Sequence, residues 1–269
     1  MVKPALGFLV LLLSLPASAR AQEIVALQTR PGVTQTYFLA RAPDNLRAVA
    51  VLFPGSGGYI RIRTENGQIK FDAQNFLVRS RVEFVNRGVV AAIVDAPSDQ
   101  QGGWGMKDEF RLGEKHRADV AAVAADLNRR FPGAPLFLVG TSRGTISAAA
   151  AGAGMSPPPA GVVLTSSVFR KTGPRSKEPG PGLSGFDFAS IQVPLLFVHH
   201  ASDQCSTTPY GDAYRLADKY PLISVLGGLP PKSDACDALS QHGYYGRESE
   251  TVEEIVNWML KKPFKDLVQ

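Results

Sequence analysis

The sequence predicts an α/β fold in a single domain, with a mostly parallel central sheet and helices on both of its faces. The chain has 269 residues, of which 44% are hydrophobic, and this is enough for one large core. Its runs of Val, Ile, Leu and Phe are almost continuously apolar, as in strands covered on both faces. Segments with helical spacing separate these runs, which favours crossover helices on a parallel sheet.

Six apolar runs are the predicted strands of the parallel core. They span residues 47–53, 88–95, 135–139, 160–168, 194–200 and 221–226. The earlier stretch TYFLAR, residues 36–41, is predicted to pair antiparallel in a hairpin at one edge of the sheet.

Helical patterns lie between and after these strands. They cover residues 72–87, 111–130, 143–153, 209–220 and 249–262. In the second helix, Val120, Val123 and Leu127 fall on one face, which we expect to be buried. Polar side chains of the same helix, Asp119 and Asp126 among them, are expected to point to solvent.

Residues 1–21 have the pattern of a secretory signal peptide. Lys3 precedes an apolar run over residues 5–15, and Ala19-Arg20-Ala21 matches a cleavage site. The alternative is a membrane anchor, but the run is shorter than the ~20 residues that a spanning helix needs. We therefore expect a secreted or periplasmic protein without a stable membrane anchor, whose mature domain covers residues 22–269.

The charge balance does not indicate a nucleic-acid-binding protein. Without residues 1–21 the 29 basic residues fall to 27 against 24 acidic ones, a net charge of +3. No basic cluster is interleaved with aromatic residues. In an exported chain, the two cysteines Cys205 and Cys236 are predicted to form a disulfide, the alternative being two buried free thiols.

The stretch GTSRG places Ser142 between Gly140 and Gly144, just where a predicted buried strand gives way to a helix. A sharp turn there lifts the serine side chain out of the sheet, and the turn is so tight that its neighbours must be small. The N-terminus of the following helix favours negative charge at the serine oxygen. This context predicts a nucleophilic serine.

From residue 36 to the C-terminus the chain resembles the α/β-hydrolase superfamily, as a secreted serine-esterase-like member. In that family the nucleophile, the acid and the histidine follow one another along the chain. His116 precedes Ser142 and is excluded, whereas His242 follows the last predicted strand and is the expected base.

The acid of the triad is expected directly after a strand between the serine and the histidine. Asp203 follows the strand over residues 194–200 and is our candidate, with Asp234 and Asp237 as runners-up. A bond between Cys205 and Cys236 would then tie the acid loop to the histidine loop.

The family also takes two backbone N–H groups to bind the oxyanion. The resemblance assigns them to Arg143, which follows the nucleophile, and to Ser56 in the loop FPGSGGY, with Gly57 as the fallback. This loop has Ile60 where a dinucleotide-binding loop has its third glycine, and it lacks a Gly-Lys-Ser/Thr ending. No cofactor is expected.

His199 and His200 end a predicted strand beside Asp203, which raises the question of a metal site. Their spacing and the lack of a clear third ligand argue against zinc. They are expected instead to buttress the acid loop, and no metal is predicted.

These residues predict an exported serine hydrolase that cleaves small or polymeric carboxylic esters through an acyl-enzyme on Ser142. The alternatives are a serine peptidase or amidase of the same fold and a binding protein on a hydrolase scaffold. The short insert over residues 169–192 predicts an open site. The aromatic candidates for the pocket walls are Tyr59, Trp104, Phe110 and Tyr244.

Overall fold

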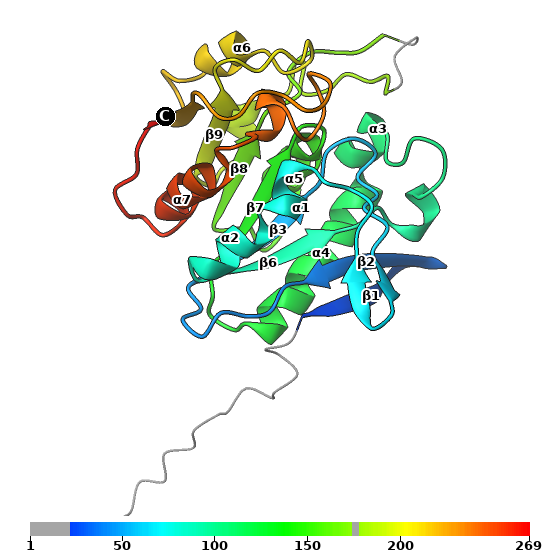
Figure 1. Ribbon diagram of the computed structural model, residues 1–269. Helices are drawn as coiled ribbons and strands as arrows, with labels where there is room; N and C mark the ends of the chain where they lie inside the picture. The colour runs from blue at the N-terminus through cyan, green and yellow to red at the C-terminus, as the bar shows by residue number, and fades with distance from the viewer. Residues whose placement is uncertain (1–21, 174–177) are drawn as a thin grey trace, which may run out of the picture.

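The computed structural model of the protein describes residues 22–173 and 178–269. The predicted signal peptide lies outside these residues. Within them, nine strands form one central sheet (Figure 1). The strands are β1 (Glu23–Arg30), β2 (Val33–Leu39), β3 (Ala48–Phe53), β6 (Val89–Val94), β7 (Leu136–Thr141), β8 (Gly161–Thr165), β9 (Leu195–His200), β10 (Leu222–Val225) and β11 (Leu267–Val268).

The sheet is mostly parallel, as predicted. Its strand order is β1-β2-β6-β3-β7-β8-β9-β10-β11, and every pair from β6 to β11 is parallel. At the centre, Val51 of β3 lies between Ala92 of β6 and Leu138 of β7. The predicted antiparallel strand is β2, which pairs with both β6 and β1. The sequence did not predict β1, which is the outer strand of this hairpin.

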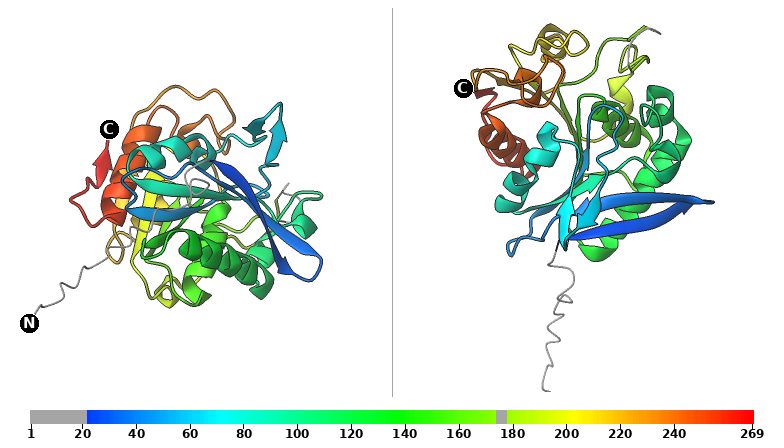
Figure 2. Two further views of the ribbon diagram at one scale, coloured as in Figure 1. Left: turned by 90° about the horizontal axis from the view of Figure 1, so that it is seen from below. Right: turned by 45° about the vertical axis from the view of Figure 1, so that its right-hand side comes forward.

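Helices cover both faces of the sheet (Figure 2). One face carries α1 (Phe76–Arg79), α2 (Arg81–Asn86) and α7 (Glu248–Met259), and the other carries α3 (Asp108–Leu112), α4 (Glu114–Arg130) and α5 (Gly144–Gly154). The short α6 (Tyr210–Tyr214) follows β9, and a separate hairpin joins β4 (Arg63–Glu65) to β5 (Gln68–Lys70). Among the described residues, no helix is long and apolar enough to cross a membrane.

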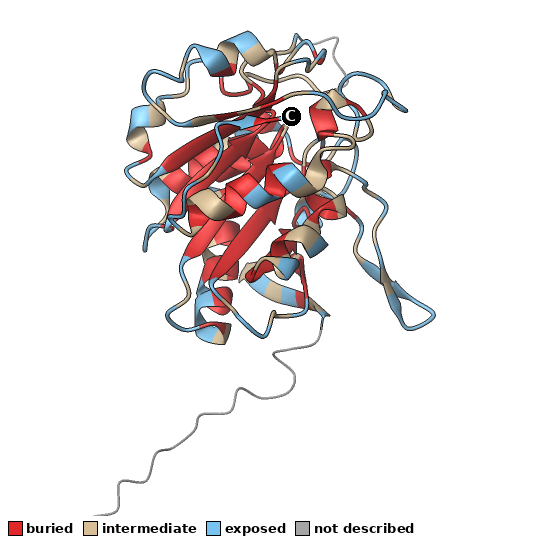
Figure 3. Ribbon diagram, turned by 60° about the vertical axis from the view of Figure 1, so that its left-hand side comes forward, coloured by how far each residue is buried: buried red, intermediate tan, exposed pale blue. Residues whose placement is uncertain are grey.

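Two hydrophobic cores lie on opposite faces of the sheet. Along β3, Val51 and Phe53 pack with residues of α4 and α5, whereas Ala50 and Leu52 pack with residues of α1 and α7. All of β3 is buried, in keeping with the buried central strands in Figure 3. Because each fully buried Val, Leu or Phe contributes about 1.5–3 kcal/mol, the central strands form a rigid base for the loops at their ends.

The helix predicted over residues 111–130 differs from α4 in two respects. It begins at Glu114, because Gly113 separates it from α3. Asp119 and Asp126 are buried, although the sequence placed them toward solvent. The β1–β2 hairpin covers them: Arg30 donates a hydrogen bond to Asp119 at 2.9 Å, and the Tyr37 hydroxyl donates one to Asp126.

The segment predicted as one helix over residues 72–87 forms two short helices instead. α1 ends at Arg79 and α2 begins at Arg81, with Ser80 between them. The Asn75 side chain accepts a hydrogen bond from the Val78 N–H and so caps α1, which explains why the helix starts later than predicted.

Candidate active site

Ser142 lies in a sharp turn between β7 and α5, with a positive φ of 52°. A Cβ atom at Gly140 would lie 2.4 Å from the Gly144 carbonyl oxygen, and one at Gly144 would lie 2.0 Å from the Phe53 oxygen. Both positions therefore require glycine. A non-glycine residue at positive φ costs about 1–3 kcal/mol, so the surrounding structure maintains this conformation.

His242 and Asp203 come together from two loops at the carboxyl ends of the strands. His242 lies in the short 3-10 helix η4 (Gln241–Gly243), and Asp203 lies in the turn after β9. The distance between His242 Nδ1 and Asp203 Oδ2 is 2.9 Å. Within the described residues, the runners-up Asp234 and Asp237 make no hydrogen bond to this imidazole.

Hydrogen bonds hold the Asp203 side chain in place. Its Oδ2 accepts from the Thr208 hydroxyl at 2.9 Å, and its Oδ1 accepts from the Cys205 N–H at 2.9 Å. Burial raises the pKa of Asp203, but hydrogen bonds from His199 and His242 outweigh burial and hold that pKa well below its usual range. The carboxylate is therefore ionised at neutral pH.

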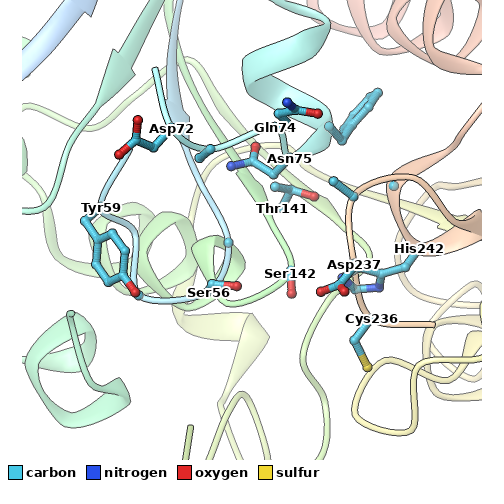
Figure 4. Close-up of a pocket in the computed structure, with 16 residues that line it drawn as sticks. Ser56, Tyr59, Asp72, Gln74, Asn75, Thr141, Ser142, Cys236, Asp237 and His242 are labelled. Carbon is cyan, nitrogen blue, oxygen red and sulfur yellow. The ribbon is translucent and has the colours of Figure 1, made fainter. Parts of the chain in front are cut away.

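An ionised Asp203 determines which nitrogen of His242 carries the proton. Since the carboxylate only accepts hydrogen bonds, Nδ1 donates to it, and Nε2 keeps a free lone pair. Nε2 is buried and has no hydrogen-bond partner in the described part of the chain. His242 and Ser142 line the same pocket (Figure 4). In this protonation state the imidazole can accept a proton at Nε2.

The two strand-end histidines buttress the acid loop, as the sequence suggested. The His199 Nε2 donates to the Thr208 carbonyl at 2.7 Å and lies 3.5 Å from Asp203 Oδ2. The His200 Nδ1 accepts from the Ser202 N–H of the acid loop at 3.1 Å, and its Nε2 donates to the Gly227 carbonyl at 3.0 Å. Within residues 22–173 and 178–269, no group of three or more His, Cys, Asp or Glu side chains is arranged to hold a metal ion.

A disulfide and an arginine fix the loop that carries His242. Cys205 and Cys236 are bonded, with their Cα atoms 4.6 Å apart, so the acid loop is tied to the histidine loop. Arg79 of α1 donates hydrogen bonds to the Ala238 carbonyl at 2.8 Å and to the Gly243 carbonyl at 3.0 Å. Sequence reasoning did not find Arg79, because its partners are backbone atoms more than 150 residues away.

The loop over residues 53–59 runs directly beside Ser142. A Cβ atom at Gly55 would lie 2.9 Å from Ser142 Cβ, so the two backbones are in close contact there. The next residue, Ser56, has a φ of 47°. Within the described residues, the N–H groups of Ser56 and Arg143 donate no hydrogen bond to the protein, so both are available to a ligand.

Two pockets of the described structure meet at Ser142. The smaller has a volume of about 260 Å³ and includes Asp237 and His242, and the larger, of about 890 Å³, includes Trp104. Tyr59 lines both pockets. In Figure 4, Ser56 and Tyr59 lie on one side of Ser142, with Asp237 and His242 on the other.

Two of the four aromatic residues proposed as pocket walls do not line either pocket. Phe110 packs on His116, with the ring centroids 5.5 Å apart. Tyr244 is fully buried, and its hydroxyl donates to the Val198 carbonyl at 2.8 Å. The predictions for Phe110 and Tyr244 were therefore wrong. Trp104 does line the larger pocket and is 58% exposed.

Comparison with known proteins identifies the fold. No protein-family model matches the chain, and no curated protein matches it. Several solved structures do match the chain. A sugar hydrolase, YeeB, from Lactococcus lactis has a TM-score of 0.61 and 15% identity, over 90% of this chain and 98% of that one. Est1E from Butyrivibrio proteoclasticus has a TM-score of 0.57 and 14% identity, over 89% and 99%.

A third match is XC6422 from Xanthomonas campestris, described as an α/β serine hydrolase without a lid. It has a TM-score of 0.55 and 16% identity, over 90% of this chain and 97% of that one. This chain has the α/β-hydrolase fold. Within this fold, Ser142 follows β7, Asp203 follows β9, and His242 lies in the segment between β10 and α7.

Two further residues of this α/β-hydrolase fold contact the candidate site and were not predicted. Thr208 donates to Asp203 and lies 3.1 Å from His242 Nδ1. Arg111 is completely buried and contacts the loop that carries Ser56. A threonine and an arginine in polar segments give no sequence signal of such contacts.

Proposed function

We propose that the chain is a serine hydrolase that cleaves carboxylic esters through an acyl-enzyme on Ser142. The observation that carries the proposal is the 2.9 Å contact between His242 Nδ1 and Asp203, which leaves Nε2 without a partner on a histidine that lines the same pocket as Ser142. The strained conformation of Ser142 supports it, because such strain concentrates at functional sites.

The proposed reaction has two halves. Ser142 Oγ attacks the ester carbonyl while His242 Nε2 accepts the hydroxyl proton, and the proton then passes to the departing alcohol. A water molecule attacks the acyl-enzyme in the same way, which releases the acid and restores the serine. Asp203 orients the imidazole and stabilises its charged form in both halves.

The negative charge of each tetrahedral intermediate needs hydrogen-bond donors. We propose the N–H groups of Arg143 and Ser56, with Gly57 as the fallback for the second donor, since those of Arg143 and Ser56 have no hydrogen-bond partner within the described residues. The N-terminus of α5 adds a favourable partial charge.

The site is proposed to accept neutral and bulky esters. The described residues that line the smaller pocket include no Lys or Arg, but they include Asp72 and Asp237. Asp72 is paired with Arg61 and Arg63, so the charge of Asp237 is the one that favours uncharged or cationic acyl groups over anionic ones. The short insert over residues 169–192 and the large adjoining pocket favour an open site. Est1E, a neighbour of the same fold, has been solved with ferulic acid bound.

Export is part of the proposal. The signal-peptide pattern of residues 1–21 and the disulfide between Cys205 and Cys236 both support a secreted or periplasmic location.

The test is hydrolysis of 4-nitrophenyl acetate and butyrate beside amino-acid 4-nitroanilides. The proposal expects turnover of the esters and at least a thousandfold loss in Ser142→Ala. Ser184→Ala is the matched control, since Ser184 is exposed and lies outside both pockets. Turnover of anilides alone would favour a peptidase, and no turnover by the folded protein would favour a binding protein.

A further inference from the structure

Arg111 of α3 is a fully buried cation, with 0% of its surface exposed. One of its terminal nitrogens donates to the Ser56 carbonyl at 2.6 Å, and the other donates to the Ser147 hydroxyl at 2.8 Å. Both partners are neutral. In the described part of the chain, Arg111 forms no salt bridge, because its acidic neighbour Asp108 is bound to Arg143 instead.

Burying an arginine in a protein core without an ion pair costs free energy. Burial, together with the nearby charge of Arg143, lowers the pKa of Arg111 to about 10, so the guanidinium stays protonated at neutral pH. A buried charge of this kind is kept only where hydrogen bonds compensate for its lost hydration. A methionine of similar length would fill the space without that cost, so the contact with Ser56 needs a reason.

The contact fixes a turn beside the nucleophile. The Gly58 N–H donates to the Gly55 carbonyl at 3.0 Å and closes the turn, while the Met106 N–H donates to the Gly57 carbonyl at 2.8 Å. A Cβ atom at Gly58 would lie 2.8 Å from the Arg111 guanidinium, so the glycine allows this close approach.

The direction of the Ser56 carbonyl determines the direction of the next N–H group. In a trans peptide the N–H points opposite to the carbonyl. Because the Ser56 carbonyl is drawn to the buried Arg111, the N–H of Gly57 points away from Arg111, and Gly57 lines the smaller pocket. Holding one carbonyl therefore sets the plane of the peptide beside the nucleophile.

We propose that Arg111 is a positioning residue that, through the Ser56 carbonyl, fixes the Ser56–Gly57 peptide and so holds the Gly57 N–H, the fallback second donor, where the oxyanion forms. It touches no substrate atom. The inference rests on the proposed function, because it assigns Arg111 to the oxyanion site of that same reaction.

The experiment compares Arg111→Met and Arg111→Lys with the wild type, with Ser147→Ala as the matched control. Ser147→Ala removes the other neutral partner of the same guanidinium and leaves the contact with Ser56 in place. Active sites are counted with a fluorophosphonate, so that kcat refers to folded enzyme only. Values of kcat and KM are then measured with 4-nitrophenyl acetate.

The expected loss in Arg111→Met is about 10- to 100-fold in kcat, with KM within threefold, because loss of one oxyanion donor costs about 10²–10³ in kcat. Arg111→Lys should recover part of this loss, since an ammonium can still donate to one carbonyl. Ser147→Ala should stay within threefold of the wild type. A kcat for Arg111→Met within threefold of the wild type, or an equal loss in Ser147→Ala, would overturn the proposal.

Amide hydrogen exchange separates this inference from the proposed function. Arg111→Lys should speed exchange in a peptide that covers residues 53–59, whereas Ser147→Ala should not. If the wild type hydrolyses no ester, the proposed function fails, and this exchange result still shows whether Arg111 holds the loop. Unchanged exchange in both Arg111 variants would contradict the anchoring itself.

Discussion

Removing the disulfide should destabilise the protein by an amount that follows from its position in the chain. Cys205 and Cys236 are 31 residues apart, and loop-closure entropy for a ring of that size is about 3.7 kcal/mol at 25 °C. The variant is the double substitution Cys205→Ser and Cys236→Ser. Cys205 is buried, and Thr207 Oγ1 lies 3.3 Å from its sulfur, so a serine hydroxyl there has a partner.

The assay is urea unfolding of the mature protein at pH 7, with and without a reductant. The free energy of unfolding should fall by about 3.7 kcal/mol, and the Tm should fall by roughly 7–15 °C. Reductant should lower the stability of the wild type by a similar amount and leave the double variant unchanged. A loss below about 1 kcal/mol would refute the reasoning, because the two loops would then be held together without the bond.

Three further predictions concern the charges of the site. Asp203→Asn should lower kcat for 4-nitrophenyl acetate by about 10⁴-fold, because His242 loses the acceptor that sets its tautomer, and a loss below tenfold would place the acid elsewhere. Since the pKa of Asp203 is lowered on folding, its stabilising effect is complete above the unfolded pKa of about 3.9 and is lost as the pH falls further. Urea unfolding between pH 5 and 2 should therefore show a shallower loss of stability in Asp203→Asn than in the wild type, and equal slopes would contradict this. Asp237→Asn should raise kcat/KM for an anionic succinyl ester relative to a neutral ester by about threefold at low salt, for charges ~6 Å apart in water. Asp234→Asn is the control, because Asp234 lines only the larger pocket, and an equal change in both variants would show that the position of Asp237 is unimportant.

The parallel core could be predicted from local patterns, and the convergence of three side chains from those patterns together with the family resemblance. A strand that is buried on both faces reads as a continuous apolar run, and the carboxyl ends of parallel strands lie at one edge of the sheet. The family resemblance supplied the order nucleophile, acid, histidine, and positions after predicted strands then singled out Asp203 and His242 to accompany Ser142. The glycines around Ser142 strengthened the prediction, since the turn excludes a Cβ at both positions.

Elements at the margins of the fold could not be predicted, because tertiary contacts decide them. β1 is half exposed and gives no continuous apolar run, yet it buries Asp119 by way of Arg30. Tyr244 lies in a glycine-containing loop and was proposed as a pocket wall. Its φ is positive, at 58°, and its ring is buried in the core instead. Neither Arg111 nor Thr208 could be predicted from a periodic sequence pattern. The partners of Arg111 are distant in the sequence, and Thr208 lies in a polar loop.

The central claim is that Ser142 is an activated nucleophile. The most direct test is the intact mass of the mature, non-reduced protein before and after treatment with a fluorophosphonate, with Ser142→Ala alongside. The account predicts one adduct on the wild type and none on the variant. Folded wild-type protein that takes up no adduct, or a variant that is labelled equally, would contradict it.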